Sequence, residues 1–155
     1  MAARRLVVLA LAALMLTFLP STSADNSLQS ANTLTEGVSV SGQVCYDDGC
    51  SPTDETDWWR VYAYKGDIVS ISFSGTLPNP DWLCIWGDGW EGDYSIHDSN
   101  GGQIASLALS DDNPTGTLSK TMSKADWVYV KIKGKDSLCN DAIDYTLTAS
   151  IDSND

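Results

Sequence analysis

Two neighbouring runs decide the fold, Asp57–Lys65 (DWWRVYAYK) and Val69–Phe73 (VSISF). In each run every second residue is apolar, so the apolar side chains lie on one face. A period of two is typical of a β-strand with one buried face. Lys65–Asp67 (KGD) separates the two runs as a turn, and we therefore expect the runs to form a β-hairpin.

The same alternation recurs along the chain between clusters of Gly, Asn, Asp and Pro. The further strands that we expect are Val38–Val44, Asp81–Trp86, Tyr94–His97, Gln103–Leu109, Gly116–Met122, Trp127–Lys133 and Ile143–Ile151. About eight short strands, each with one apolar face, must pack as two facing sheets. The sequence thus predicts an all-β fold, a β-sandwich with jelly-roll or Greek-key connections, preceded by a short helical turn at Ser27–Leu34.

The first 24 residues are expected to lie outside this domain. Arg4 and Arg5 precede an apolar run from Leu6 to Leu19, and small and turn-forming residues follow up to Ala24. This order is typical of a secretory signal peptide. The apolar run is shorter than the roughly 20 residues of a membrane-spanning helix, and no later run is longer. We therefore expect cleavage after Ala24, a single secreted domain at residues 25–155, and no membrane span after cleavage.

The chain is strongly acidic. It has 21 Asp and Glu residues, 9 Lys and Arg residues and a formal net charge of -12. Such a surface repels phosphate backbones, which excludes nucleic acid as a partner. It suits divalent cations, basic partners or a salty medium, and it also serves solubility alone.

Four cysteines indicate disulfide bonds rather than a metal centre. They are Cys45, Cys50, Cys84 and Cys139. An even number of cysteines in an exported chain predicts two disulfides, for which three pairings exist. We favour Cys45–Cys50, because the intervening YDDG is turn-like, and this choice leaves Cys84–Cys139. A zinc site is the weaker alternative, because the chain has no Cys-x-x-Cys motif and a single histidine.

Five segments of the mature chain together resemble a known family. They are DNSLQSANTLTEGVSVSGQV at 25–44, DETDWWRVYAYKGDIVSISFSG at 54–75, DSNGGQIA at 98–105, DWVYVKIKG at 126–134 and DYTLTASI at 144–151. Their order and spacing resemble the bacterial and archaeal pre-peptidase C-terminal domain. The resemblance implies a jelly-roll β-sandwich similar to the collagen-binding domains of clostridial collagenases. It also implies a non-catalytic domain that accompanies a secreted peptidase.

The resemblance further implies a calcium site. Some members of the family bind Ca²⁺ through an N-terminal linker and an Asp-x-x-Asp segment, whose matching positions here are Asp25, Asn26, Asp54 and Asp57. Ca²⁺ takes about six to eight oxygen ligands, which carboxylates in a loop before a strand can supply. The alternative is that Asp54 makes a cap or turn and that Asp57 is exposed.

Trp82, Trp86 and Trp90 are candidate ligand-binding residues. They lie in the segment Trp82–Asp93, which has no counterpart in the resembled domain. Exposed aromatic side chains give a large contact area and suit sugars or protein surfaces. The alternative is that the segment folds back over these indoles as a small second core, held by the Cys84–Cys139 bridge.

No motif predicts catalysis. The chain has neither a Gly-x-Ser-x-Gly nor a His-Glu-x-x-His motif. A Ser-His-Asp site would need His97 next to Asp98, and a surface histidine at a strand end is the simpler interpretation. Asp98–Gly101 (DSNG) is better explained as a turn than as a calcium loop.

The sequence therefore predicts a secreted, non-catalytic accessory or binding domain that binds an extracellular protein and carries one structural calcium ion. The alternative is a carbohydrate-binding module that binds polysaccharide through the three tryptophans. A small hydrolase using His97 or a pair of aspartates is the third hypothesis.

Overall fold

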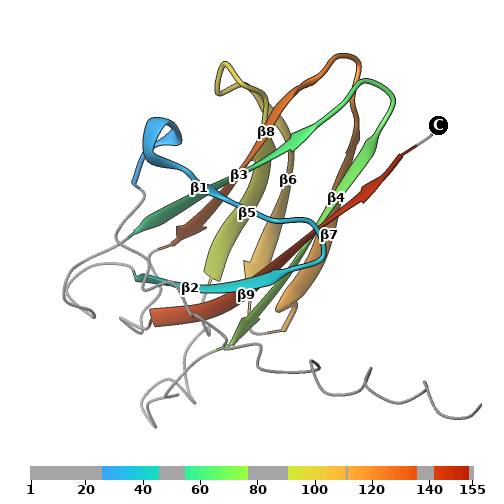
Figure 1. The fold of residues 1–155 in the computed structure, drawn as a ribbon. Coiled ribbons are helices and arrows are strands. Elements are labelled where there is room, and N and C mark those ends of the chain that lie inside the picture. The colour runs from blue at the N-terminus through green and yellow to red at the C-terminus, as the bar shows by residue number, and fades with distance from the viewer. Residues whose placement is uncertain (1–25, 46–54, 77–90, 111, 136–141, 154–155) are drawn as a thin grey trace, which may run out of the picture.

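Two β-sheets packed face to face make up the molecule (Figure 1). The computed structural model describes residues 26–45, 55–76, 91–110, 112–135 and 142–153. Sheet A has the strand order β1-β3-β8-β5-β6, and sheet B has the order β2-β9-β4-β7. The strands of sheet A are β1 Asn32–Thr33, β3 Thr56–Ala63, β5 Glu91–His97, β6 Gln103–Ser110 and β8 Asp126–Gly134. Those of sheet B are β2 Ser39–Cys45, β4 Ile68–Thr76, β7 Thr115–Thr121 and β9 Ala142–Asp152.

The connectivity of the strands is that of a jelly roll. Strands β2 to β9 divide into the antiparallel sets 3-8-5-6 and 2-9-4-7. This division into two interleaved four-stranded sheets is the jelly-roll arrangement. The short β1 adds to the edge of sheet A, parallel to β3. The predicted all-β sandwich is therefore confirmed.

The predicted hairpin between the first two runs is wrong. β3 lies in sheet A and β4 in sheet B, so the chain between them crosses from one sheet to the other. The corner is fixed by Asp67, whose Oδ2 accepts the backbone N–H of Tyr64 at 2.7 Å, and by Gly66 with φ of 98°. A hairpin turn and a sheet-crossing corner require the same kind of short polar segment. The alternation of apolar residues therefore predicted where the strands lie but not which strands pair with one another.

The core lies between the two sheets and is built from the apolar faces of all the long strands. Its fully buried side chains include Tyr94, Ile71, Ile96, Ile132, Leu147, Val44, Val69, Val128 and Val130. Tyr94 of sheet A donates its hydroxyl to the backbone oxygen of Ile71 in sheet B at 2.6 Å. This bond satisfies a buried polar group and joins the two layers. Burial raises the pKa of Tyr94, so the hydroxyl stays protonated at physiological pH.

The N-terminal segment runs along one edge of the sandwich, from β1 at the edge of sheet A to β2 at the edge of sheet B (Figure 1). It contains the 3₁₀ turn η1 Leu28–Ser30, whose N-cap is Ser27, so the predicted helical turn is confirmed only in its first half. Beyond η1 the backbone N–H of Leu34 binds the oxygen of Arg60 at 2.8 Å, and Ala31 and Leu34 are buried. No helix among the described residues has the length and apolar character needed to cross a membrane.

Candidate functional site

The outer face of sheet A carries a group of aromatic and basic side chains. We call it the aromatic–basic face and define it by Trp58, Arg60 and Tyr62 of β3 and Trp127, Tyr129 and Lys131 of β8. The register places Trp58 opposite Lys131, Arg60 opposite Tyr129 and Tyr62 opposite Trp127. Alternation along both strands therefore brings all six side chains to the side of the sheet that faces away from the core.

The rings and cations of this face contact one another. The Arg60 guanidinium lies 4.6 Å from the centre of the Trp127 ring, and the Lys131 ammonium lies 5.4 Å from that of Trp58. Both distances are within the range of cation–π attraction. Tyr62 is 41 % exposed and meets Trp127 edge to face, with ring centres 5.2 Å apart. Tyr64, 68 % exposed, extends the row beyond the end of β3. Tyr129 is buried, at 7 % exposed, and the other members apart from Tyr62 are half-buried. The face is thus internally ordered and is most exposed at Tyr62 and Tyr64.

The outer face of sheet B carries small hydroxyl side chains where that of sheet A carries rings and cations. Two consecutive rows across its four strands, and a third row across β9, β4 and β7, carry only Ser and Thr at their outward positions. These residues are Ser39, Ser41, Ser70, Ser72, Ser74, Thr115, Thr117, Ser119, Thr146, Thr148 and Ser150. Several hydroxyls pair across strands, as in Ser70–Ser119 at 2.7 Å and Ser72–Thr117 at 3.0 Å. We call this surface the hydroxyl face. It has neither a ring nor a cation within those rows, so large contact residues are concentrated on one side of the sandwich.

His97 lies beside the aromatic–basic face and is 7 % exposed. Its Nδ1 is 3.1 Å from the backbone oxygen of Gly101, and its Nε2 is 2.9 Å from the Ser95 hydroxyl. A carbonyl oxygen only accepts, so Nδ1 carries the proton and Nε2 accepts from Ser95 in the neutral ring. The Trp58 ring lies against the imidazole, with ring centres 5.1 Å apart.

The Ser95–His97 pair resembles a nucleophile and its base, but the described residues around it do not supply the rest of a hydrolytic site. Ser95 is buried in a strand that pairs with β6 on one side and with β8 on the other. Its neighbouring backbone N–H groups therefore belong to the sheet and are not free to stabilise an oxyanion. The position of His97 at a strand end, as expected from the sequence, is confirmed, although the ring is buried rather than on the surface.

His97 makes the stability of the fold depend on pH. Burial and the charge of Lys131 lower its pKa, against the bond to Gly101 and the charge of Asp98, which raise it. The unfolded chain therefore binds one more proton than the folded chain between the folded pKa and about 6.5. We expect the free energy of unfolding to fall by at most about 1.4 kcal/mol per pH unit as the pH is lowered from about 7.5 to 5, and the melting temperature to fall with it.

The control for this pH effect is His97→Gln, which retains a polar side chain but does not titrate. Because both proteins share all other ionisable groups, the difference between their melting curves isolates the histidine. Parallel curves for the two proteins across this range would show that His97 does not couple protonation to folding.

Asp57, a predicted calcium ligand, is 2 % exposed. Its Oδ2 accepts the hydroxyl of Tyr145, which in turn accepts Trp59 Nε1–H at 2.8 Å. We call Asp57, Trp59 and Tyr145 the buried hydrogen-bond chain. The alternative in which Asp57 is exposed is therefore wrong. Asn26, a second predicted ligand, is exposed, while Asp25 and Asp54 lie outside the described residues.

Other predicted site residues cannot be placed from the described residues. Trp82, Trp86 and Trp90 all lie outside them, as do Cys50, Cys84 and Cys139. Cys45, at the end of β2, is not a free thiol. The two disulfides and their pairing remain predictions. Within the described ranges, no three His, Cys, Asp or Glu side chains are grouped so that they could hold a metal ion.

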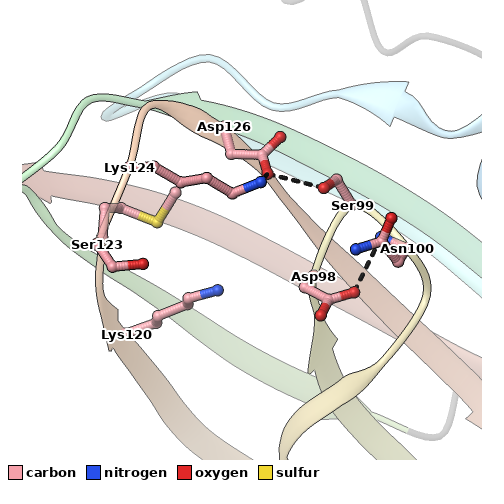
Figure 2. A pocket seen from close by; sticks show the side chains of 8 residues that line it. Asp98, Ser99, Asn100, Lys120, Ser123, Lys124 and Asp126 are labelled. Carbon is pink, nitrogen blue, oxygen red and sulfur yellow. Dashed lines mark hydrogen bonds and ion pairs between the residues drawn. The ribbon is translucent and has the colours of Figure 1, made fainter.

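A crevice of about 160 Å³ lies at one end of the sandwich, between the β5–β6 turn and the β7–β8 loop (Figure 2). Its walls hold paired charges. Asp126 contacts Lys124 at 2.8 Å and Ser99 at 2.7 Å, and these bonds lower its pKa to about 2. Asp98 accepts the backbone N–H groups of Asn100 and Gly102, each at 2.9 Å, which confirms the predicted turn. The acidic groups of this crevice thus hold the loops in place.

The residues of the aromatic–basic face lie on strands that were predicted from the sequence, but the face itself was not predicted. The signal was present in β3, where Trp58, Arg60 and Tyr62 alternate with core residues. What was missing was the pairing of β3 with β8, more than 60 residues further along the chain, which adds Trp127 and Lys131. Strand partners at that separation cannot be read from a single sequence.

Comparison with known proteins supports the fold. No protein-family model and no curated protein sequence matches the chain. Among solved structures, the pre-peptidase C-terminal domain of the collagenase from Bacillus anthracis matches with a TM-score of 0.51 and 15 % identity, over 77 % of this chain and 94 % of that one. The resemblance predicted from the sequence is therefore confirmed at the level of the fold.

Two further solved structures are similar. The surface-associated copper-binding protein CorA of Methylomicrobium album BG8 matches with a TM-score of 0.54 and 10 % identity, over 79 % of this chain and 98 % of that one. PliG, a periplasmic inhibitor of g-type lysozyme from Aeromonas hydrophila, matches with a TM-score of 0.46 and 11 % identity, over 79 % and 97 % of the two chains. At these identities the likeness concerns the fold alone, and the site must be interpreted from the chain's own residues.

Proposed function

We propose that this chain is a secreted, non-catalytic binding domain that recognises an extracellular protein through its aromatic–basic face. The observation that carries the proposal is the concentration of Trp, Tyr and Arg side chains on one exposed sheet face. These three residue types dominate the binding energy of protein interfaces. The opposite face has only hydroxyl groups in its three central rows, so it offers no comparable anchors.

Ring orientation favours a protein over a neutral sugar chain as the partner. A sugar chain stacks on rings that share a plane, whereas Tyr62 stands at 72° to Trp127 and at 88° to Tyr64. One side of the Trp127 ring is also occupied by Arg60. A folded protein surface can meet rings at varied angles, because its own side chains differ in shape. The carbohydrate alternative rests on Trp82, Trp86 and Trp90 and is an outcome of the test below.

The test compares the wild type with Tyr62→Ala/Trp127→Ala. Both chains are immobilised and exposed to fibrillar collagen, chitin and the secreted fraction of the producing cells, before and after protease treatment. We expect capture of a protease-sensitive ligand that weakens about 30-fold in the variant, because two interface anchors of about 1 kcal/mol each are removed. Ser72→Ala/Thr117→Ala on the hydroxyl face is the matched control and should bind like the wild type.

Two results would contradict this proposal. One is a protein ligand captured equally by the wild type and by Tyr62→Ala/Trp127→Ala, which would place the binding surface elsewhere. The other is a ligand that survives protease and is lost in Trp82→Ala or Trp86→Ala, which would favour the carbohydrate-binding alternative. Circular dichroism of each variant distinguishes lost binding from lost folding.

The absence of catalysis is part of the same proposal. It is supported by the burial of Ser95 and His97 and by the pairing of β5 on both sides. Hydrolysis of ester, peptide or glycoside substrates by the wild type that is abolished in His97→Ala would overturn it.

A structural calcium ion held by Asp25, Asn26, Asp54 and Asp57 remains a separate proposal. The buried hydrogen-bond chain already uses Oδ2 of Asp57. If the ion binds, a chelator lowers the melting temperature and Asp54→Asn removes that effect. Asp54 is preferred over Asp57 for this test, because loss of Asp57 also disturbs Tyr145. Identical melting curves with and without chelator would exclude the ion.

A further inference from the structure

The basic residues of the chain are concentrated around one face. Nine Lys and Arg residues occur, and without Arg4 and Arg5 of the predicted signal peptide seven remain. Of these seven, Arg60 lies in β3, Lys131 and Lys133 lie in β8, and Lys135 follows β8 directly. The outward positions of β3 and β8 hold no acidic residue. A chain with a net charge of -12 thus has a local surface of the opposite sign.

Three of these cations form no ion pair with a carboxylate of the described residues. The ion pairs formed by the described residues are Lys124–Asp126 and Lys135–Asp93. No carboxylate of the described ranges lies within ion-pair distance of Arg60, Lys131 or Lys133. Arg60 makes a single weak hydrogen bond, from Nε to the Thr33 hydroxyl at 3.4 Å. Its terminal nitrogens therefore remain available to a ligand.

The aromatic rings hold two of the cations in place. Stacking of Arg60 on Trp127 and of Lys131 on Trp58 restricts these long side chains before any ligand arrives. Ordering them in advance reduces the entropy lost on binding. A stacked guanidinium also keeps its edge free for two parallel bonds to one carboxylate.

The negative charge elsewhere on the chain does not cancel this local attraction. At physiological salt the Debye length is about 8 Å, so charges on distant parts of the surface are largely screened at the point of contact. On β3 and β8 the charge that a partner meets is therefore set by Arg60, Lys131 and Lys133. The acidic Asp93 of β5 lies opposite Lys133 and is already paired with Lys135 at 2.9 Å.

From these observations we infer that the partner presents an acidic polypeptide segment, whose carboxylates pair with Arg60, Lys131 and Lys133. The inference rests on the proposed function and specifies the chemistry of its partner. Aromatic contacts with Tyr62 and Trp127 add affinity, and the cations select for acidic sequences.

The test measures binding of poly-L-glutamate by tryptophan fluorescence, with polygalacturonate and poly-L-lysine as further probes. We expect poly-L-glutamate to bind and its dissociation constant to rise about tenfold between about 0.05 and 0.5 M NaCl. Arg60→Gln/Lys131→Gln should lose about tenfold in affinity and most of the salt dependence. Lys120→Gln, which removes a charge from β7 of sheet B, is the matched control and should behave like the wild type.

Failure of the inference differs from failure of the proposed function. If poly-L-glutamate does not bind, or binds Arg60→Gln/Lys131→Gln as well as the wild type, the acidic partner is wrong. Binding of polygalacturonate alone would assign the face to an acidic polysaccharide instead. If protein capture is lost in Tyr62→Ala/Trp127→Ala while the charge variant captures normally, the binding face is supported and only its preference for acidic partners is overturned.

Discussion

Gly42→Ala is expected to destabilise the fold by about 3 kcal/mol, the largest effect of any single methyl group that the structure indicates. Gly42 lies in β2 opposite Tyr145 of β9. A Cβ at this position would lie 2.2 Å from the Tyr145 hydroxyl oxygen and 2.4 Å from its ring carbon Cζ. The ring cannot move aside, because its hydroxyl is bound to Trp59 and Asp57. Thermal unfolding should show a melting temperature lower by about 10 °C.

Gly116→Ala is the matched control for this prediction. A Cβ on Gly116 would lie 2.0 Å from Leu107 Cδ2, which is as close a contact as the one at Gly42. The atom it meets is the end of a flexible side chain at the edge of sheet A, which can rotate away. We expect a loss of about 1 kcal/mol for this variant. Equal losses at the two glycines would show that the rigidity of the Tyr145 ring does not decide the cost.

Strand positions were predictable from this sequence because each long strand has one buried face. The buried residues of β3 and β4, and of β9 up to Ala149, alternate without interruption, and the observed strands lie within a few residues of the expected ones. The pairing of strands was not predictable. The corner at Tyr64–Asp67 has the composition of a hairpin turn, and only the packing of two complete sheets distinguishes the two possibilities. β1 was missed because a strand of two residues has no periodicity.

The candidate site, like the pairing of strands, depends on residues that lie far apart in the sequence. The candidates predicted from the sequence were carboxylates before a strand and the three tryptophans of the segment Trp82–Asp93. The aromatic–basic face instead lies on the strands, and its cations become a surface only when β3 and β8 pair. Asp57 is a further example. The family resemblance implied that Asp57 binds calcium, whereas its hydrogen bond with Tyr145, 88 residues away, could not be predicted from the local sequence.

Tyr145→Phe is expected to cost about 3 kcal/mol, although it removes one oxygen atom and leaves the volume of the core unchanged. Its hydroxyl accepts from Trp59 Nε1 and donates to Asp57 Oδ2, so the variant takes away one hydrogen bond from each of two buried groups. A buried group deprived of a partner loses about 1 to 3 kcal/mol, and more when it is charged. In denaturant unfolding, the midpoint concentration should be lower. The slope of the unfolding free energy against denaturant concentration should be unchanged, because the surface exposed on unfolding is the same.

The control for Tyr145→Phe is Tyr94→Phe, which removes a buried hydroxyl that donates to one backbone oxygen. That carbonyl is uncharged, so we expect the loss to be about 1 to 2 kcal/mol.

Combining Gly42→Ala with Tyr145→Phe adds a second test, because the phenylalanine ring no longer holds its position through hydrogen bonds. It can shift away from the new methyl group, so the double variant should lose less than the sum of the two single losses. Strict additivity would mean that the hydrogen bonds of Tyr145 do not fix its ring against β2.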